Sequence, residues 1–390
     1  MNYIITGGTG FIGTHLANLI KEQDKNAQVW NLDIVDPEKL DKLNEECRMK
    51  NEECSSTKEI YKEIEEYTTI KQWKSPVKDG EKRMSTFVYC DVRKPIENLP
   101  FTPTPDDIIF NFAAVHRTPG HPDHAYFETN IRGAENVCAF AEKWGIKNIV
   151  FTSSIAPYGA AEELKEETTL PTPNTPYGIS KLVAEKIHLG WKNSLTPDPS
   201  PKERGERMHK WLTIVRPGVV FGKGENGNFT RLYWAIRGHK FAYPGRKDTI
   251  KACIYVKELV RFIWWRATLN EECRMKNEET TFGGRRESQC IFNCCFEPAY
   301  TIEHIVGAMK KVTGLTQFVP DIPNWVIMPA ATVIGALGAP MGICPARVKK
   351  LQISTNICGK KLAECGYKFK WSFEEALEDW FNDNGRKGLL

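Results

Sequence analysis

The chain has 390 residues, of which 41% are hydrophobic and 26% charged, so it can bury a large core in one large or two smaller domains. Its net charge of +4 is too small to indicate a nucleic-acid-binding protein, and no basic cluster is interleaved with aromatic residues. The twelve cysteines show neither a CxxC pair nor a Cys/His metal spacing, so we expect reduced thiols, no metal and a cytoplasmic protein.

The first segment has the pattern of a nucleotide-binding unit. Residues 2–5 predict a short buried strand, the glycine-rich sequence GGTGFIG follows at 7–13, and residues 14–20 continue at helical spacing. In such a turn one glycine supplies unusual backbone angles, one lets the backbone approach a diphosphate, and one lets the helix pack closely. The amides and dipole at the start of that helix attract the diphosphate. Because the strand begins at residue 2, we expect no signal peptide.

A second strand, predicted at residues 28–32, ends in Asp33, which stands twenty residues beyond Gly13. A carboxylate at this distance can accept both hydroxyls of an adenosine ribose. Its charge would repel a 2′-phosphate, and no Lys or Arg follows before Lys39, so the sequence favours NAD over NADP. The alternative is a strand-end Asp that only caps a turn.

Three polar segments, about 37–84, 194–210 and 269–283, have the character of inserts. The sequence LNEECRMKNEE at 43–53 recurs residue for residue at 269–279, which indicates a duplicated or inserted element in surface loops. The segment near 194–205 is rich in proline and polar residues and predicts a disordered linker. The alternative for these segments is a partner-binding arm.

Further strands are predicted at 86–90, 108–112 and 148–151, with a helix at 130–144 between the last two. Strands that alternate with helices indicate a doubly wound parallel sheet with its site at the carboxyl ends of the strands. Two pairs of residues follow these strands. Asp91 and Val92 could meet the adenine edge, and the small Ala113 and Ala114 would let the cofactor lie close to the backbone.

The candidate catalytic residues come next. Ser154 follows the fifth strand, and a predicted helix that opens at Pro176 carries Tyr177 and Lys181 on one face. A phenol normally loses its proton near pH ~10, but an adjacent ammonium and a cationic nicotinamide favour the phenolate. Tyr177 could then take a proton from a sugar hydroxyl while hydride leaves the same carbon, with Ser154 bonded to that oxygen. The alternative is an ordinary amphipathic helix start.

Together these motifs resemble the extended short-chain dehydrogenase/reductase family, and more narrowly its NAD-dependent nucleotide-sugar epimerase and dehydratase branch. The motifs are GGTGFIG at 7–13, Asp33, Asp91-Val92, NFAA at 111–114, Ser154, YGISK at 177–181 and RPGVVFG at 216–222. The resemblance implies a Rossmann-type α/β fold with a doubly wound parallel sheet and a smaller C-terminal α/β substrate-binding domain. It implies an NAD-binding domain at 1–217 and a mainly substrate-binding domain at 218–390, with about 249–268 returning to the Rossmann core.

The resemblance also implies roles for individual residues. Tyr177 would be the catalytic base, Lys181 would also hold the nicotinamide ribose, and Ser154 would be the third catalytic residue. The residues expected to bind NAD are Gly7, Gly10, Phe11, Ile12, Gly13, Asp33, Asp91, Val92, Ala113, Ala114, Tyr177, Lys181, Pro217 and Val219. Those expected to bind a nucleotide-sugar substrate are Thr118, Asn228, Lys251 and Arg347. Lys251 stands where relatives place an Arg on the substrate diphosphate, and it lacks the bidentate fork of Arg.

Two residues narrow the reaction. Family dehydratases carry an Asp-Glu pair directly after the catalytic Ser or Thr, whereas this chain has Ile155-Ala156, which can supply neither acid nor base. A 4-epimerase or a 4-ketoreductase remains, and the NAD preference favours the epimerase, because held NAD suits a cycle that regenerates its own cofactor. The resemblance further implies a homodimer.

Residues 322–346 contain no charged residue, but four prolines interrupt the stretch. We expect a buried or interface helix, with a monotopic membrane contact as the alternative. That alternative would suit a membrane-associated dehydrogenase of sterol-like or other apolar alcohols. A non-catalytic NAD-binding or regulatory protein is the third interpretation, and the intact Ser154, Tyr177 and Lys181 set argues against it.

Overall fold

The computed structural model describes residues 1–36, 84–116, 121–194, 209–225, 227–269, 289–336 and 345–390. Within it the chain forms two compact units. The first unit comprises Met1–Gly159, Leu170–Arg216 and Leu259–Phe292, and the second comprises Ala160–Thr169, Pro217–Glu258 and Asn293–Leu390. The three expected inserts fall almost entirely outside the described residues.

The first unit is built on a seven-stranded sheet with the order β12-β7-β5-β4-β1-β2-β3. Neighbouring strands from β7 to β3 run parallel. The order reverses at β1, which lies between β2 and β4, so the carboxyl ends of β1 and β4 frame the switch point where such sheets bind ligands. The predicted doubly wound sheet is confirmed. Its strands are β1 (Asn2–Thr6), β2 (Gln28–Asp33), β3 (Thr86–Tyr89), β4 (Ile108–Asn111), β5 (Asn148–Thr152), β7 (Trp211–Pro217) and β12 (Ile291–Cys294).

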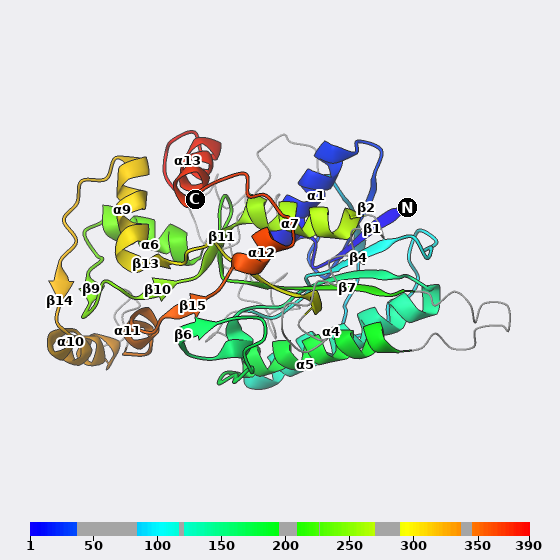
Figure 1. Ribbon diagram of the computed structural model, residues 1–390, viewed down its shortest axis with the longest axis horizontal. Helices are drawn as coiled ribbons and strands as arrows, with labels where there is room; N and C mark the ends of the chain where they lie inside the picture. The colour runs from blue at the N-terminus through cyan, green and yellow to red at the C-terminus, as the bar shows by residue number, and fades with distance from the viewer. Residues whose placement is uncertain (37–83, 117–120, 195–208, 226, 270–288, 337–344) are drawn as a thin grey trace, which may run out of the picture. The chain divides into compact units, whose positions relative to one another are not determined.

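The central strands of this sheet are buried because helices cover them. Ile4, Phe110, Ile149 and Ile214 are fully buried, as expected for apolar strands in a parallel sheet covered on both faces. The helices are α1 (Phe11–Gln23), α4 (Asp123–Trp144) and α5 (Pro176–Asn193), and α7 (Val256–Thr268) brings the chain back from the second unit. Helices α4 and α5 lie side by side (Figure 1). Helix α4 begins seven residues earlier than predicted, directly after Pro122.

The second unit is also α/β. A four-stranded sheet has the order β13-β10-β15-β6, and two further pairs join β8 to β11 and β9 to β14. The strands are β6 (Ala161–Lys165), β8 (Val219–Phe221), β9 (Tyr243–Pro244), β10 (Ile250–Lys251), β11 (Cys253–Tyr255), β13 (Tyr300–Thr301), β14 (Asp321–Ile322) and β15 (Thr355–Ile357). The helices are α6 (Asn228–Arg237), α9 (Ile302–Thr313), α10 (Asn324–Ala336), α11 (Pro345–Gln352), α12 (Lys360–Glu364) and α13 (Phe373–Asp383).

An aromatic cluster forms the core of the second unit. The ring of Phe221 stacks on Phe229 with centroids 4.6 Å apart, and the rings of Tyr255, Phe373 and Trp380 surround it. Helix α13 brings two of these rings, and its start is fixed by a capping box in which Ser372 and Glu375 exchange hydrogen bonds. The closing amphipathic helix predicted at 373–381 is confirmed, and it runs two residues further.

The uncharged stretch at 322–346 forms α10 over its described first part. Of the two expectations, a helix buried within the chain is wrong there, and an interface helix stays a prediction. Trp325 is 78% exposed and Val326 is 39% exposed. A lack of charge shows that a segment prefers apolar surroundings, but it does not show whether the same chain supplies them. No helix in the described part of the chain is both long enough and apolar enough to span a bilayer.

Candidate active site

The glycine-rich turn joins β1 to α1 in close contact with the end of β4. Gly7 has φ +70°, and a Cβ there would lie 2.7 Å from the amide nitrogen of Ala113. At Gly13 a Cβ would lie 2.6 Å from Cα of Gly8, so glycine is needed there for the helix to pack on the turn. Substitution at either position would push apart backbone segments that frame the switch point.

The start of α1 is prepared for an anion. Gly10 is the N-cap, no side chain caps the helix, and no acidic residue lies in its first turn, which Phe11 and Ile12 begin. Uncapped N-terminal amides at the positive end of a helix dipole bind phosphate groups well. This part of the chain therefore fits the diphosphate of a dinucleotide.

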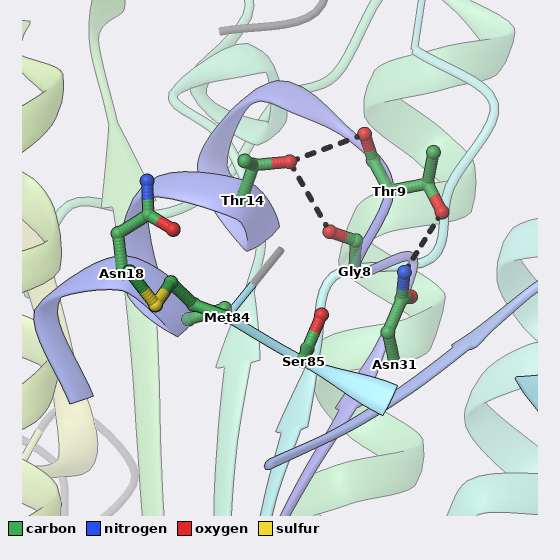
Figure 2. A pocket seen from close by; sticks show the side chains of 8 residues that line it. Gly8, Thr9, Thr14, Asn18, Asn31, Met84 and Ser85 are labelled. Atoms are coloured by element: carbon green, nitrogen blue, oxygen red, sulfur yellow. Dashed lines mark hydrogen bonds between the residues drawn. The ribbon is translucent and has the colours of Figure 1, made fainter. Parts of the chain in front are cut away.

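One glycine contact was missed from the sequence. A Cβ at Gly8 would lie 2.4 Å from Oδ1 of Asn31, so the strand β2 side chain occupies the space that a larger residue would need. Asn31 donates to Oγ1 of Thr9 at 2.9 Å (Figure 2). The single hydroxyl proton of Thr14 is within reach of three carbonyl oxygens of the turn, those of Gly8, Thr9 and, nearest at 3.0 Å, Gly10. The small pocket in Figure 2 is lined by Gly8, Thr9, Thr14, Ala17, Asn18, Asn31, Met84 and Ser85. It contains none of the predicted cofactor residues, so it is not the predicted NAD site.

Asp33 ends β2 beside the glycine-rich turn. Its Oδ2 accepts from the amide of Thr9 at 3.0 Å, and its Oδ1 accepts from the amide of Val35 at 3.1 Å. Burial raises the pKa of Asp33, and these backbone hydrogen bonds oppose that rise. Each carboxylate oxygen retains acceptor capacity, which is what a pair of ribose hydroxyls requires.

We expect Asp33→Asn to weaken NAD binding about 10- to 100-fold, because hydrogen bonds to a charged acceptor contribute about 1.5–3 kcal/mol. Loss of the negative charge should also narrow the preference for NAD over NADP. Titration calorimetry with both cofactors measures the two effects, and Asp106→Asn, at an exposed position of the same unit, is the matched control. Unchanged NAD affinity in Asp33→Asn would leave Asp33 with only its turn-capping role.

Asp91 and Val92 follow β3 and are held in place by their own unit. Although burial raises the pKa of Asp91, hydrogen bonds from Arg93 outweigh that effect and hold the pKa below its usual range. The carboxylate accepts from Nε of Arg93 at 2.9 Å and from Nη2 at 2.8 Å. Val92 is buried, and its carbonyl oxygen accepts from Asn136 at 2.8 Å. Their contact with adenine stays a prediction.

The loop that carries Ala113 and Ala114 is tied to α4 and α5 by a buried amide that sequence reasoning missed. Asn130 accepts from the amide of Val115 at 2.9 Å and donates to its carbonyl oxygen at 3.1 Å. Its Nδ2 also donates to Oγ of Ser180 at 2.9 Å. One side chain therefore links the loop after β4 to the helix that carries Tyr177 and Lys181.

The structure brings the three predicted catalytic residues together at the carboxyl end of β5. The hydroxyl of Ser154 lies near enough to the phenol of Tyr177 to lower its pKa through hydrogen bonding. Lys181 follows one helical turn after Tyr177, and its Nζ donates to the carbonyl oxygen of Thr152 at 2.8 Å. Helix α5 starts at the required place because Thr175 caps it, accepting from the amide of Gly178 at 3.1 Å, and Pro176 occupies its first position.

Burial shifts both ionisable groups of this set. It raises the pKa of Tyr177 to about 12, against the opposing effect of the Ser154 hydrogen bond. It lowers the pKa of Lys181 to about 7, against the opposing charge of Glu185. Tyr177 is therefore a phenol at neutral pH in the chain alone, and a positive charge placed beside it would favour the phenolate.

A buried ion pair lies next to Ser154, Tyr177 and Lys181 in the chain, since one of its members, Glu185, follows Lys181 by one helical turn. Arg216 donates through Nε to Oε1 of Glu185 at 2.8 Å and through Nη2 to Oε2, in a bidentate pair. Ser153 donates to the same carboxylate, and the guanidinium lies 4.7 Å from the ring centroid of Tyr158. The side chains of Arg216 and Glu185 are 2% and 1% exposed. Glu185 stands one helical turn beyond Lys181, which is the sequence signal that could have identified it.

The remaining candidates lie in the second unit or outside the described residues. Pro217 ends β7, and Val219 begins β8. Asn228 begins α6 and accepts from Arg231, while Lys251 donates to the carbonyl oxygen of Ile353 at 2.6 Å. The structure therefore gives each of these polar candidates a partner within its own unit. Thr118 and the side chain of Arg347 lie outside the described residues, and the described residues contain no cluster of His, Cys, Asp or Glu suited to a metal.

A model of the NAD dependent epimerase/dehydratase family matches residues 3–276. The chain belongs to this family. The family is NAD-dependent, so the predicted cofactor and the resemblance are confirmed, and the chain is an enzyme of the epimerase and oxidoreductase type.

The curated relatives are epimerases by name. The chain is 28% identical over 278 residues to the N-acetyl-alpha-D-glucosaminyl-diphospho-ditrans,octacis-undecaprenol 4-epimerase of Escherichia coli O157:H7, covering 70% of this chain and 76% of that one. It is 24% identical over 255 residues to an uncharacterized UDP-glucose epimerase of Bacillus subtilis (strain 168), covering 61% and 71%. Both alignments extend over most of the relative's length.

Solved structures share the fold. The UDP-glucose 4-epimerase of Thermotoga maritima, crystallised with UDP-glucose, aligns with a TM-score of 0.61 and 18% identity over 99% of each chain. The UDP-glucuronic acid 4-epimerase of Bacillus cereus, in complex with NAD, aligns with a TM-score of 0.59 and 15% identity over 99% of this chain and all of that one. The predicted Rossmann-type α/β class agrees with these structures.

Proposed function

We propose that this enzyme is an NAD-dependent 4-epimerase of a sugar carried on a diphosphate, with nucleotide sugars as the first substrate class. The observation that carries the proposal is the set of Ser154, Tyr177 and Lys181 at the end of β5, where Nζ of Lys181 donates to the carbonyl oxygen of Thr152 and the Ser154 hydroxyl influences the pKa of Tyr177. A 4-ketoreductase would use the same three residues, so the fate of the cofactor distinguishes the two reactions.

The chain's own residues would handle the proton. Tyr177 accepts the proton of the hydroxyl on sugar carbon 4, Ser154 holds that oxygen by a hydrogen bond, and the charge of Lys181 stabilises the phenolate. NAD, when bound, would supply the hydride acceptor, and return of the hydride to the opposite face of carbon 4, with return of the proton from Tyr177 to its oxygen, would complete an epimerisation without net consumption of cofactor. The diphosphate would lie at the uncapped start of α1 and the ribose at Asp33.

Dehydration is disfavoured by the residues that follow Ser154. Ile155 caps the short 3-10 helix Ala156–Tyr158, and Ala156 begins it. Neither side chain can donate or accept a proton, so the elimination that a dehydratase performs has no acid and base at these two positions.

The lipid-linked relative suggests a second substrate class. The Escherichia coli relative acts, by its name, on a sugar joined through diphosphate to undecaprenol. The exposed apolar side chains of α10 in the second unit favour a lipid-linked sugar diphosphate as the alternative to a nucleotide sugar. The named relatives do not favour the third substrate type, a sterol-like alcohol.

We also propose a homodimer, with α4 and α5 as its interface. Helix α5 leaves Ile179 and Val183 40% and 37% exposed, one turn apart on the same helix face. Light scattering of the purified protein measures the oligomeric state, and Val183→Glu should shift it towards the monomer. The cytoplasmic location stays a prediction.

The deciding experiment incubates the purified full-length protein, without added cofactor, with UDP-, GDP- and dTDP-sugars and with a polyprenyl-diphosphate-linked N-acetylhexosamine. Chromatography follows sugar composition, and absorbance follows NADH. Interconversion of two 4-epimers without net NADH is the expected result. Consumption of added NADH with a 4-keto sugar would instead make the enzyme a reductase, and no reaction in any arm would contradict both assignments.

A further inference from the structure

One apolar surface of the second unit takes no part in the proton and hydride transfer proposed at Ser154, Tyr177 and Lys181. It is formed by the start of α10 and the end of α11, and we name it the α10–α11 face. Four apolar side chains are exposed on it, namely Trp325 (78%), Val326 (39%), Leu351 (38%) and Ile353 (43%). Figure 1 shows the two helices side by side at one end of this unit.

Gln352 links by hydrogen bonds the two segments that carry these four side chains. Gln352, between Leu351 and Ile353, donates to Oδ1 of Asn324 at 2.8 Å and to the carbonyl oxygen of Pro244 at 2.9 Å. Asn324 directly precedes Trp325 and Val326. The end of α11 is therefore fixed against the start of α10, so the segments that carry the exposed apolar residues adjoin.

Helix α10 lacks the pattern of a helix that faces water. A surface helix has an apolar stripe and a charged opposite face, whereas the thirteen residues of α10 include no charged residue. Thirteen residues rise about 20 Å, less than the hydrocarbon core of about 30 Å, so the length of α10 suits a position along a bilayer surface.

The charge beside this apolar surface selects the lipid. Helix α11 carries Arg347, Lys349 and Lys350 and no acidic residue, and Lys349 is exposed. Cations next to an apolar surface helix attract the negative phosphates of anionic lipids. The nearby acids Glu162 and Asp248 are already paired with Arg246.

We propose that the α10–α11 face docks on the surface of an anionic phospholipid bilayer. Trp325 and Val326 enter the boundary between headgroups and acyl chains, and the exposed Lys349 lies at the phosphates. Tryptophan suits this depth because its ring is apolar and its N–H can bond to the interface. Docking is a property separate from the proposed epimerase reaction, so its test needs no substrate.

The test is flotation of the full-length protein with vesicles of phosphatidylcholine alone or of phosphatidylcholine with phosphatidylglycerol. We expect the protein to float with the phosphatidylglycerol vesicles and to be released by high salt. The double variant Trp325→Glu/Val326→Glu should lower the bound fraction at least about tenfold, because binding scales with inserted apolar area. Lys349→Glu should weaken binding to the anionic vesicles only.

Leu170→Glu is the matched control, since Leu170 is 66% exposed in the first unit and should float like the unchanged protein. Light scattering accompanies each variant. The proposal is overturned if the protein ignores phosphatidylglycerol vesicles, or if the double variant floats as well as the control. It is also overturned if the double variant converts a dimer to a monomer without changing flotation, which would assign the face to a second copy of the chain.

Discussion

Tyr177→Phe is expected to lower kcat for epimerisation by about 10²- to 10⁴-fold, the usual contribution of a positioned acid or base. The substitution removes only the phenolic oxygen, which is the proposed proton acceptor and the atom whose pKa Ser154 lowers. Substrate and NAD affinity should change far less than kcat, because the start of α1 and Asp33, which are expected to hold the diphosphate and ribose of NAD, are not altered. The effect should therefore appear in kcat, with KM nearly constant.

The pH profile gives an independent readout of the same residue. A base acts only after it has lost its proton, so log kcat/KM in the native enzyme should rise with pH until the acceptor is ionised. In Tyr177→Phe that rise should disappear. Tyr89→Phe, at a position 70% exposed, is the matched control and should keep both the rate and the profile. Full activity in Tyr177→Phe would remove Tyr177 from the mechanism.

Local sequence patterns were sufficient to predict much of the first unit. The glycine-rich turn and Asp33 are specified by residues close in sequence, and the structure places them side by side through the Thr9 amide. The Tyr177 and Lys181 spacing is likewise a property of a single helix. These features could be predicted because a turn, a strand end and one helical turn each depend on few neighbouring residues.

Long-range complementarity could not be predicted in the same way. The amide of Asn130 bonds a residue fifty positions away, and the partner of Glu185 lies 31 positions away on β7. Each side chain alone fits many surroundings, so only the fold shows its partner. Lys251 shows the same dependence on the fold, since the sequence could not indicate that its Nζ donates to the carbonyl oxygen of Ile353, 102 positions away; its contact with a substrate diphosphate stays a prediction.

The prediction that α10 is buried within the chain failed for a related reason. An uncharged sequence has the same composition whether it is covered by its own chain, by a second copy or by lipid. Trp325 had to be seen at 78% exposure before the buried interpretation could be rejected. The predicted cofactor turn did not have this difficulty because its partners, β1 and α1, adjoin it in the chain.

Breaking the buried pair of Glu185 and Arg216 should have the largest effect on stability. We expect Glu185→Met or Arg216→Met alone to lower the free energy of unfolding by about 3–5 kcal/mol, because each substitution leaves the other residue of the pair as a buried charge without its partner. The double variant Glu185→Met/Arg216→Met should be much less destabilised than the sum of the two, since well-packed apolar groups can replace a buried pair at little cost. Urea unfolding at pH 7 measures all four proteins.

The double variant also separates stability from catalysis. Glu185 is the group whose charge opposes the burial-driven fall in the pKa of Lys181, which stands at about 7. Without that carboxylate the pKa of Lys181 should fall further, so at pH 7 more of the lysine is neutral and less positive charge supports the phenolate of Tyr177. The double variant should therefore fold well and yet lose activity, with recovery as the pH is lowered and Lys181 regains its proton. A fully active double variant would show that Glu185 serves packing alone.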